Sequence, residues 1–289
     1  MGLDIIKYIN RYRRAYRNWF IVLYKIKMKK FPFTARTLNS NLKIQITNHI
    51  MAYNISWYEY IGYIYSIEIN VVEVLKFKNE LIKPLKFYGA IYDGDIQGVF
   101  GQDIYGDVEC KGVTVLDIGA NIGDSAIYFA MKAASRVIAL EPFPVTYEFA
   151  KRNIEVNGFL DKIVLINGGV AKQDGSISIP NNITSSGGME ARESECGPKI
   201  QFFTLESISK AFNLEIGSIL KIDCEGCEYD IINCTQDKIL LQFKQIIMEY
   251  HHGIKELVAR LSSIGFQVQV NHRGSLIGDI IAKNMKLLS

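Results

Sequence analysis

Cysteine is scarce in this 289-residue sequence, and its five residues are an odd number that argues against a framework of disulfide bonds. Such usage fits a reducing compartment better than a secreted protein. Three of the five lie late in the chain, at positions 224, 227 and 234. The pair Cys224 and Cys227 has no partner pair at the spacing of a zinc site, and a redox role would need a thioredoxin-like unit, which the pattern described below does not form.

No hydrophobic run in the sequence approaches the ~18 residues of a membrane-spanning helix. The apolar stretch Trp19 to Tyr24 is bounded by Asn18 and Lys25, which also makes it too short for a signal peptide. We therefore expect a cytoplasmic protein. With 48% hydrophobic and 22% charged residues, the composition is that of a globular chain and not of a disordered one.

Acidic residues are nearly missing from residues 1–36, where Asp4 stands against ten Lys and Arg residues. This segment carries a charge of +9, so the remaining residues carry −6 of the total of +3. Apolar side chains recur in it at three- and four-residue steps, which predicts a basic amphipathic helical arm. They are Ile5, Tyr8, Ile9, Tyr12, Tyr16, Trp19, Phe20 and Leu23.

Three kinds of contact are open to this arm. Its apolar stripe can pack on the protein's own body or on a second copy of the chain, which would make a homo-oligomer. It can instead make a peripheral contact with an anionic membrane surface. Nucleic acid is a less favoured partner, because the rest of the chain is acidic.

Residues 37–110 alternate short apolar runs with polar breaks and are dense in tyrosine and isoleucine. This composition favours strands, although residues 50–64 are also compatible with a helix. We expect a small mixed α/β region with no evident site of its own. Its boundary is predicted near Cys110-Lys111-Gly112, so that residues 111–289 form the main domain.

From Val113 onward, β-branched runs alternate with helical segments. Strands are expected at 113–117, 137–141, 162–166, 218–223 and 244–249, with helices at 124–134, 142–157, 204–212, 227–234 and 253–263. A hairpin of 266–270 and 277–283 closes the chain. This order predicts an α/β fold with a doubly wound, mostly parallel sheet and an antiparallel last strand, and ligands are expected at the C-terminal ends of its strands. We expect the loop at 181–199 to cover an acceptor.

The segment from Thr114 to Asp124 predicts a strand, a tight turn with Gly119 and Gly123, and the start of a helix. A dinucleotide fingerprint would need a third glycine at another spacing, and the acid Asp117 just ahead of the loop would repel a pyrophosphate but attract an ammonium. Glu141 ends the next predicted strand, near the offset at which an acid meets ribose hydroxyls. An ammonium at Asp117 and a ribose at Glu141 together favour S-adenosyl-L-methionine over a nicotinamide cofactor.

Carboxylates crowd the ends of two later strands. Asp223, Glu225 and Glu228 fall within six residues at a strand-to-helix turn, which costs stability unless the charges are used or shared. Glu225 and Glu228 can also serve the dipole of the following helix. His251, or with less support His252, leaves the neighbouring strand after Glu249 and could take a proton from a substrate hydroxyl. A metal site of Asp223, Glu225 and His251 is conceivable, but the spacing does not require one, and we predict none.

Several of these blocks, taken in order, resemble the FkbM family of S-adenosylmethionine-dependent methyltransferases. The resemblance spans about residues 85–283, and its most specific part is Lys221-Ile-Asp-Cys-Glu-Gly-Cys-Glu228. Glu206 stands where the family usually has aspartate, and the basic arm lies outside the family pattern. The other blocks are Asp117-Ile-Gly-Ala-Asn-Ile-Gly-Asp124, Glu141-Pro142, Asn153-Ile-Glu-Val-Asn-Gly158, Thr204-Leu-Glu206 and Glu249-Tyr-His251.

The resemblance implies a Rossmann-like class I methyltransferase fold and O-methylation of a hydroxyl on a saccharide, glycolipid or related small molecule. It implies that Asp223, Glu225 and His251 face the acceptor, with Asp223 or His251 as the general base. The residues expected around the cofactor, from the resemblance and from their places at strand ends, are Asp117, Gly119, Ala120, Asn121, Gly123, Glu141, Pro142, Gly169, Val170 and Asp223.

Two other functions stay open at this point. An RNA methyltransferase could hold phosphates with its basic arm, although no recognised RNA-binding motif is present. A membrane-bound scaffold could keep the cofactor fold without catalysing a reaction.

Overall fold

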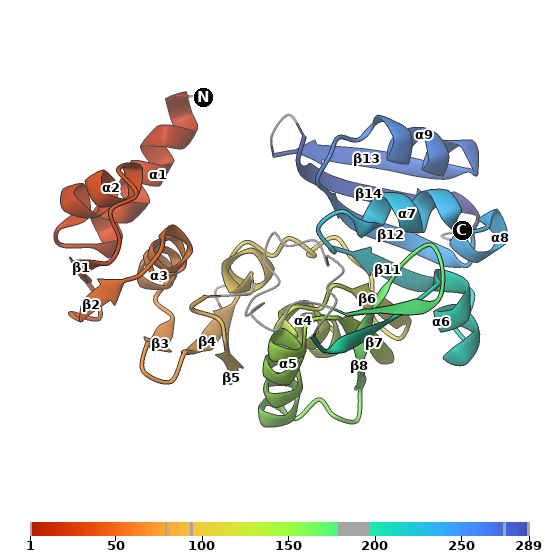
Figure 1. Cartoon of the computed structure of the whole chain (residues 1–289), viewed down its shortest axis with the longest axis horizontal. Helices are drawn as coiled ribbons and strands as arrows, with labels where there is room; N and C mark the ends of the chain where they lie inside the picture. Colours follow the sequence, from red (N-terminus) through yellow and green to blue (C-terminus); the bar gives the residue numbers. More distant parts are fainter. Residues whose placement is uncertain (1, 79, 93–94, 179–196, 274–275, 288–289) are drawn as a thin grey trace. The chain divides into compact units, whose positions relative to one another are not determined.

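The computed structural model describes residues 2–78, 80–92, 95–178, 197–273 and 276–287 (Figure 1). The chain forms two compact units, residues 1–104 and 105–289. The first unit therefore unites the predicted arm with most of the predicted mixed region. Most of the predicted acceptor loop, residues 181–196, lies outside the described residues.

The first unit combines helices with two small antiparallel sheets. Its elements are α1 (Gly2–Ala15), α2 (Trp19–Lys27), β1 (Phe33–Arg36), β2 (Lys43–Ile46), α3 (His49–Ile61), β3 (Ile64–Ser66), β4 (Val71–Phe77), β5 (Glu80–Tyr88) and a π-helix at Gln97–Gly101. Strands β1 and β2 pair with each other, and β3, β4 and β5 form the second sheet. Residues 50–64, which were compatible with a strand or a helix, are mostly helical in α3. Asn48 caps the first turn of this helix, and Gly62 ends it in the left-handed conformation.

The predicted arm is two helices and not one. Helix α1 ends at Ala15, and Asn18, which directly precedes α2, binds the backbone of Thr34 and Arg36 in β1 through its side chain. Helix α1 packs on α3 through buried Tyr12 and Tyr16, and the Tyr16 hydroxyl donates to the carbonyl oxygen of Ala52 at 2.7 Å. Two of the eight residues of the predicted stripe, Tyr12 and Tyr16, are thus buried against the protein's own body, whereas Ile5, Tyr8 and Phe20 are exposed.

The second unit is a nine-stranded sheet with strand order β13-β14-β12-β11-β6-β7-β8-β10-β9. The central strands β8, β7, β6, β11 and β12 run parallel, and β14 returns antiparallel to β12, as predicted for the closing hairpin. The bounds are β6 (Thr114–Ile118), β7 (Arg136–Glu141), β8 (Ile163–Val170), β9 (Gly175–Ser178), β10 (Lys199–Phe203), β11 (Ser218–Ile222), β12 (Phe243–Tyr250), β13 (Phe266–His272) and β14 (Gly278–Asn284).

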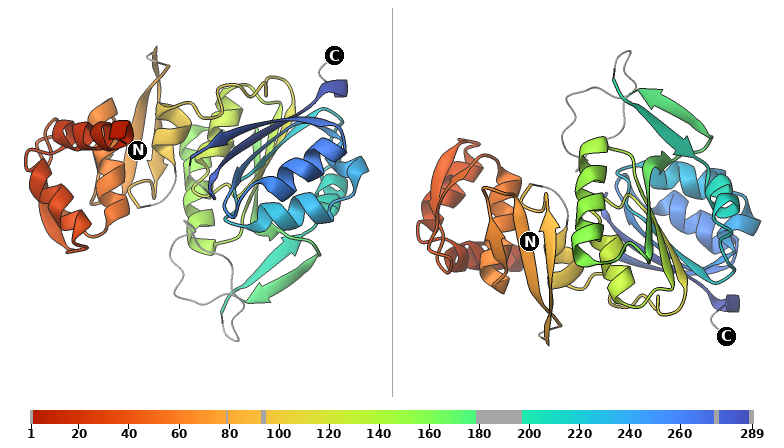
Figure 2. Two further views of the ribbon diagram at one scale, coloured as in Figure 1. Left: turned by 90° about the horizontal axis from the view of Figure 1, so that it is seen from above. Right: turned by 90° about the horizontal axis from the view of Figure 1, so that it is seen from below.

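Helices cover both faces of this sheet. Figure 2 shows α4 (Asp124–Met131) and α5 (Pro144–Asn157) on one face, and α7 (Cys227–Cys234) and α9 (Lys255–Ser263) on the other. The strands between them are buried almost throughout, as apolar parallel strands must be when both faces are covered. The remaining helices are α6 (Leu205–Ala211), α8 (Asp237–Leu240) and a 3₁₀ turn at Met285–Leu287.

The order of the parallel strands reverses between β6 and β11. A ligand in a doubly wound sheet binds beside this reversal, outside the C-terminal strand ends. The glycine loop after β6 and the acid-rich turn after β11 meet there, so the fold is the Rossmann-like one predicted. No helix of the described residues is long and apolar enough to cross a membrane.

Candidate active site

A cavity of about 550 Å³ lies at the C-terminal ends of β6, β7, β8 and β11. The strand ends bring together residues from Ile118 to Asp230 of the chain. Ile177 of β9 and Phe202 of β10 form an apolar part of the wall. The predicted site residues that line the cavity are Gly119, Asn121, Glu141, Pro142, Gly169, Val170, Asp223 and Glu225.

The loop after β6 fits closely against the β11 turn. Gly119 has a φ of 77°, and a Cβ at this position would overlap the backbone carbonyl oxygen of Asp223. The backbone N–H groups of Gly119 and Ala120 both donate to Leu140 at the end of β7. Ala120 is buried, and neither it nor Gly123 lines the cavity. These two predicted cofactor residues therefore shape the loop.

Asp117 lies beneath this loop and outside the cavity lining. It is fully buried, where its carboxylate contacts Lys221 Nζ at 3.0 Å and accepts a hydrogen bond from Ser125 Oγ at 2.6 Å. Lys221 also donates to the carbonyl oxygen of Gly119 at 2.7 Å. This differs from the expectation that Asp117 contacts a cofactor ammonium, because strand register places Lys221 directly beside it.

Lys221 keeps its positive charge in this buried position. Burial by itself would lower the pKa of Lys221, but the charges of Asp117 and Asp223 raise it above the usual value for lysine. Sequence reasoning missed this residue. The sequence feature that could have revealed it is a single lysine within the mostly apolar strand β11, which lies beside β6 with its Asp117.

Glu141 faces the cavity from the end of β7 and is only 2% exposed. Its carboxylate accepts hydrogen bonds from the backbone N–H groups of Asn121 and Phe143, both at 2.9 Å. Burial raises the pKa of Glu141 to about 8, although these two hydrogen bonds oppose the shift. The structure thus holds an acidic group in the position expected for one that binds ribose hydroxyls.

The cavity residues fit S-adenosyl-L-methionine on two grounds. Asn121 lines the cavity, and its buried Oδ1 has no hydrogen-bond partner in the described part of the chain, so a ligand N–H group could donate to it. Glu141 supplies an acceptor for hydroxyls on the same side of the loop. An ammonium and a ribose could therefore both be bound at this loop, with Asn121 in place of Asp117.

His251 is surrounded by three carboxylates. Its Nδ1 lies 3.0 Å from Glu228, and its Nε2 lies 3.2 Å from Glu225 and 3.6 Å from Glu249. Burial by itself would lower the pKa of His251, but the hydrogen bond to Glu228 and the three negative charges raise it to about 9. At neutral pH this side chain is an imidazolium. It holds the surrounding carboxylates in place and lacks the free lone pair that the predicted general base requires.

Asp223 lines the cavity directly after β11. Within the described residues, no side chain or backbone donor is bonded to its carboxylate, whereas Glu225 contacts His251. Of the three residues predicted on the acceptor side, Asp223 is therefore the one whose side chain has no hydrogen bond or ion pair among the described residues.

Glu249 lies at the outer side of this cluster, paired with Arg273 at 2.5 Å. Burial and the charge of Asp223 raise the pKa of Glu249 to about 7, although Arg273 opposes the shift. The ligand atoms of Asp223, Glu249 and His251 lie within 4.8 Å of one another. Two of these residues already have charged partners, since Glu249 pairs with Arg273 and His251 with Glu225 and Glu228. The metal set considered from the sequence was different, because it had Glu225 in place of Glu249. Sequence reasoning missed Arg273, which follows a hairpin strand and has no motif around it.

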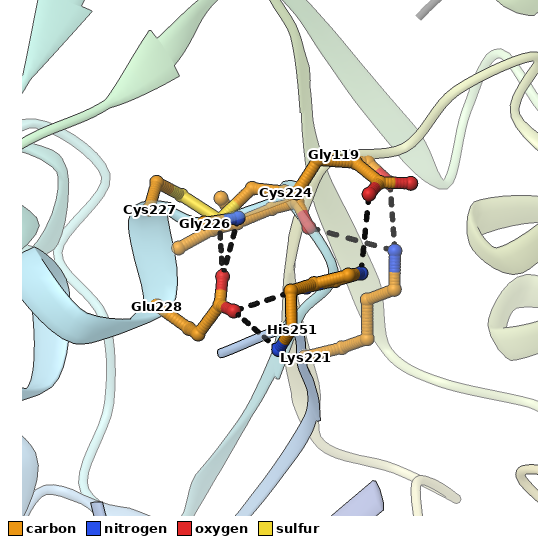
Figure 3. The surroundings of a disulfide bond; sticks show 9 residues. Gly119, Lys221, Cys224, Gly226, Cys227, Glu228 and His251 are labelled. Atoms are coloured by element: carbon orange, nitrogen blue, oxygen red, sulfur yellow. Dashed lines mark hydrogen bonds and ion pairs between the residues drawn. A yellow bond between two sulfur atoms is a disulfide. The ribbon is translucent and has the colours of Figure 1, made fainter. Parts of the chain in front are cut away.

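The two cysteines of the β11 turn are joined in a disulfide, unlike the reduced pair expected from the sequence (Figure 3). Both residues between them have positive φ, 56° at Glu225 and 123° at Gly226, which brings the two Cα atoms to 5.5 Å. Cys224 and Cys227 also line the cavity. Among the described cysteines, Cys110 and Cys234 are free.

One family model matches more than half of the chain. The profile described as "Methyltransferase FkbM domain" matches residues 117–278. A methyltransferase named sdnD from Sordaria araneosa is 23% identical over 190 residues, which cover 53% of this chain and 73% of that protein. Among solved structures, a ribosomal protein L11 methylase from Lactobacillus delbrueckii subsp. bulgaricus is 18% identical, with a TM-score of 0.40 over 66% of this chain and 81% of the other. A precorrin-6y C5,15-methyltransferase from Geobacter metallireducens is 15% identical, with a TM-score of 0.41 over 65% and 88%.

Proposed function

The chain belongs to the FkbM family of methyltransferases, which use S-adenosyl-L-methionine, and we propose that it methylates a hydroxyl group of a saccharide, a glycolipid or a related small molecule. The observation that supports this most is the carboxylate of Asp223, which faces the cavity without a bonded partner among the described residues. An alcohol becomes a good nucleophile only as its proton leaves, so a free carboxylate at this position suits an O-methyltransferase.

When bound, the cofactor supplies a methyl group on a sulfonium that is already activated for displacement. The chain's own task is then to place the acceptor oxygen and to remove its proton. We assign proton removal to Asp223. Glu225, held by the His251 imidazolium, also lines the cavity and can accept a hydrogen bond from a further hydroxyl of the acceptor. Two neighbouring carboxylates suit a hydroxyl-rich molecule better than an apolar one.

We assign cofactor binding to the cavity wall formed by the ends of β6, β7 and β8. We assign the cofactor's hydroxyls to Glu141 and its amino-acid end to Asn121 and the Gly119 backbone. Pro142, Gly169 and Val170 complete this wall. Asp117 acts indirectly in this proposal, because it and Lys221 hold the loop from beneath.

The reaction can be tested with cofactor that carries a tritiated methyl group. The full chain is incubated with separated glycan, lipid and RNA fractions, and Asp223→Asn serves as the matched blank. We expect label in the glycan or glycolipid fraction with the unaltered chain and none with the variant. Label in RNA alone would favour the RNA methyltransferase alternative and overturn this proposal.

A peripheral membrane contact is a further part of the proposal, and it rests on helix α2. Val22 points into the first unit and is fully buried, so this helix is docked through one face. The opposite face carries four apolar side chains that are 48–69% exposed. They fall within one arc of about 100° on the helix, because they are spaced by one, four and eight residues. These residues, Phe20, Ile21, Tyr24 and Met28, are called the α2 stripe below.

Positive charge surrounds the α2 stripe. Residues 19–30 contain four lysines, Lys25, Lys27, Lys29 and Lys30, and no acid. An exposed apolar stripe flanked by cations matches a surface of anionic lipid, whose headgroups pair with lysines while the aromatic rings enter the interface. Such a contact would bring the enzyme to glycolipid acceptors.

Vesicle co-sedimentation of the full chain tests the contact. We expect binding to vesicles that contain phosphatidylserine, weaker binding to phosphatidylcholine alone, and loss of binding in Phe20→Ser/Tyr24→Ser. The matched control is Ile69→Ser/Leu81→Ser, which removes two other exposed apolar residues of the same unit and should bind normally. Stripe-dependent dimers without vesicles, or stripe-dependent RNA binding, would contradict the membrane assignment.

A further inference from the structure

The disulfide in the wall of the cavity has no part in the reaction proposed above. Cys224 directly follows Asp223, and Cys227 is the first residue of α7. Both cysteines are partly exposed and both line the cavity, so a small thiol can reach them from the cavity side. We propose that Cys224 and Cys227 are a redox-active pair that exchanges with thiols, and that the disulfide state holds the site in its cofactor-binding form.

The turn between the two cysteines has an uncommon backbone conformation. Its two residues both have positive φ, and Glu225 adopts this conformation although it has a Cβ. Such backbone persists only where its surroundings enforce it. The disulfide closes a ring around these two residues. Opening it would allow Glu225 to leave this conformation and would loosen its contact with His251.

Glu228 connects the disulfide to the rest of the cluster. Figure 3 shows its carboxylate between the turn and His251. One oxygen accepts the N–H of Gly226 at 2.8 Å and lies 3.7 Å from Cys224 Sγ, and the other binds the backbone N–H and the ring of His251 at 3.1 and 3.0 Å. Glu228 is fully buried, so its carboxylate cannot exchange these contacts for water. A movement of the cysteine sulfurs should therefore displace the Glu228 carboxylate and, with it, His251.

The surroundings also predict the order of the exchange. Cys227 lies at the N-terminus of α7, where the helix stabilises a thiolate. Cys224 lies beside the Glu228 carboxylate, which repels one. The sulfur of a thiol reductant should therefore bond to Cys224 Sγ while the disulfide breaks and its electron pair leaves with Cys227 Sγ.

A second thiol completes the reaction. It attacks the reductant's own sulfur in the mixed disulfide, and Cys224 leaves and takes up a proton. The protein disulfide has then gained two electrons and two protons, and two reductant thiols have become one disulfide. The reductant class is a low-molecular-weight thiol or a dithiol.

Alkylation of the full chain measures the sulfur state directly. After treatment with oxidised glutathione and an acid quench, Cys224 and Cys227 should be protected from a maleimide label, and after dithiothreitol both should be labelled. A brief exposure to reduced glutathione should trap the mixed disulfide on Cys224. Label on both cysteines after oxidation, or trapping on Cys227, would overturn the assignment.

Calorimetry with S-adenosylhomocysteine, the demethylated product, measures the consequence for the site. We expect about tenfold weaker binding after reduction, within the usual range for coupled sites. Cys224→Ser/Cys227→Ser should bind weakly in both buffers, and the control Cys234→Ser, an exposed free cysteine, should behave like the unaltered chain. Equal affinity of the unaltered chain in the two buffers, with unchanged circular dichroism, would contradict the redox control.

This inference rests on the proposed cofactor site, but its tests use no methyl acceptor. A failure to find an acceptor would therefore leave the labelling and affinity results intact. Conversely, an unreactive disulfide would not affect the assignment of Asp223.

Discussion

Ionisable side chains around His251 differ in what they can do at neutral pH, although the sequence shows them only as a cluster of acids and a histidine. Three carboxylates hold His251 as an imidazolium, and Arg273 neutralises Glu249. Asp223 is left as the carboxylate that faces the cavity without a bonded partner in the described chain. The chemical role of each residue follows from its neighbours and not from its type.

Asp223→Asn should lower kcat by about 10²–10⁴-fold, because an amide cannot take the acceptor's proton. Cofactor affinity should change by less than about threefold, since binding is assigned to the loop after β6. Radiolabel transfer and calorimetry measure the two quantities. The control Asp161→Asn removes an exposed acid elsewhere and should change neither. Full turnover in Asp223→Asn would remove the residue from the role of base.

The raised pKa of His251 predicts a pH dependence of stability. Its folded-state pKa of about 9 exceeds the ordinary value of 6.5, so its contribution is fully present below pH 6.5 and is lost as the pH rises through 9. The free energy of unfolding should fall by at most about 3 kcal/mol over this window. Glu225, Glu228 and Glu249 are the charges that face the ring.

Denaturant titrations at several pH values measure this loss, and NMR titration of the histidine ring gives the pKa itself. Glu228→Gln should move the pKa of His251 back toward 6.5, because it removes the closest negative charge. A His251 pKa near 6.5 in the unaltered chain would contradict the protonation state argued above and would return His251 to consideration as a base.

The loop between β6 and α4 owes its conformation to tertiary contact as well as to local propensity. Gly119 in this loop and Gly158 at the end of α5 have nearly the same φ, 77° and 78°. A Cβ at Gly158 would meet nothing within 4 Å, whereas one at Gly119 would overlap the backbone of Asp223. The positive φ alone thus explains the glycine at 158. The glycine at 119 is required also because the ends of β6 and β11 approach each other closely.

Gly158→Ala should cost about 1 kcal/mol of stability, the ordinary penalty of a side chain at positive φ. Gly119→Ala should cost a further ~1–3 kcal/mol, because the β6 and β11 turns must separate. It should also weaken cofactor binding, which Gly158→Ala should leave unchanged. Chemical denaturation and calorimetry compare the pair, and equal costs for the two variants would mean that the predicted contact is absent.

At the scale of the whole molecule, the chain forms two compact units. The cavity lies entirely within residues 105–289, and the α2 stripe lies within residues 1–104. A ligand stabilises only the structure that it binds, so its effect should be confined to the unit that contains the cavity.

Hydrogen exchange with and without S-adenosylhomocysteine tests this division. At a concentration of about 100 times Kd, the ligand should stabilise the second unit by about 2.7 kcal/mol and slow its exchange. Exchange in residues 1–104 should stay the same. Equal protection of both units would show that they unfold together, and protection of residues 1–104 alone would contradict the assigned cavity.

Sequence alone determined the order of most strands and helices in the second unit, although not β9, β10 or α8. It also determined the glycine loop, the placement of Glu141 and Asp223 at strand ends, and the family. These features are encoded locally, in hydrophobic period, turn residues and short motifs, so neighbouring residues suffice to predict them. The predicted boundaries of its helices and strands agree with the structure to within a few residues.

Only the tertiary structure decided which groups meet. Strand register placed Lys221 beside Asp117. The carboxylates of Glu225, Glu228 and Glu249, which surround His251 in space, raise the pKa of its ring. Packing against α3 buried Tyr12 and Tyr16 of the predicted stripe, whereas the α2 stripe is exposed. Partners in these contacts lie far apart in the chain, and pKa and exposure depend on distance in space, which a one-dimensional pattern does not contain.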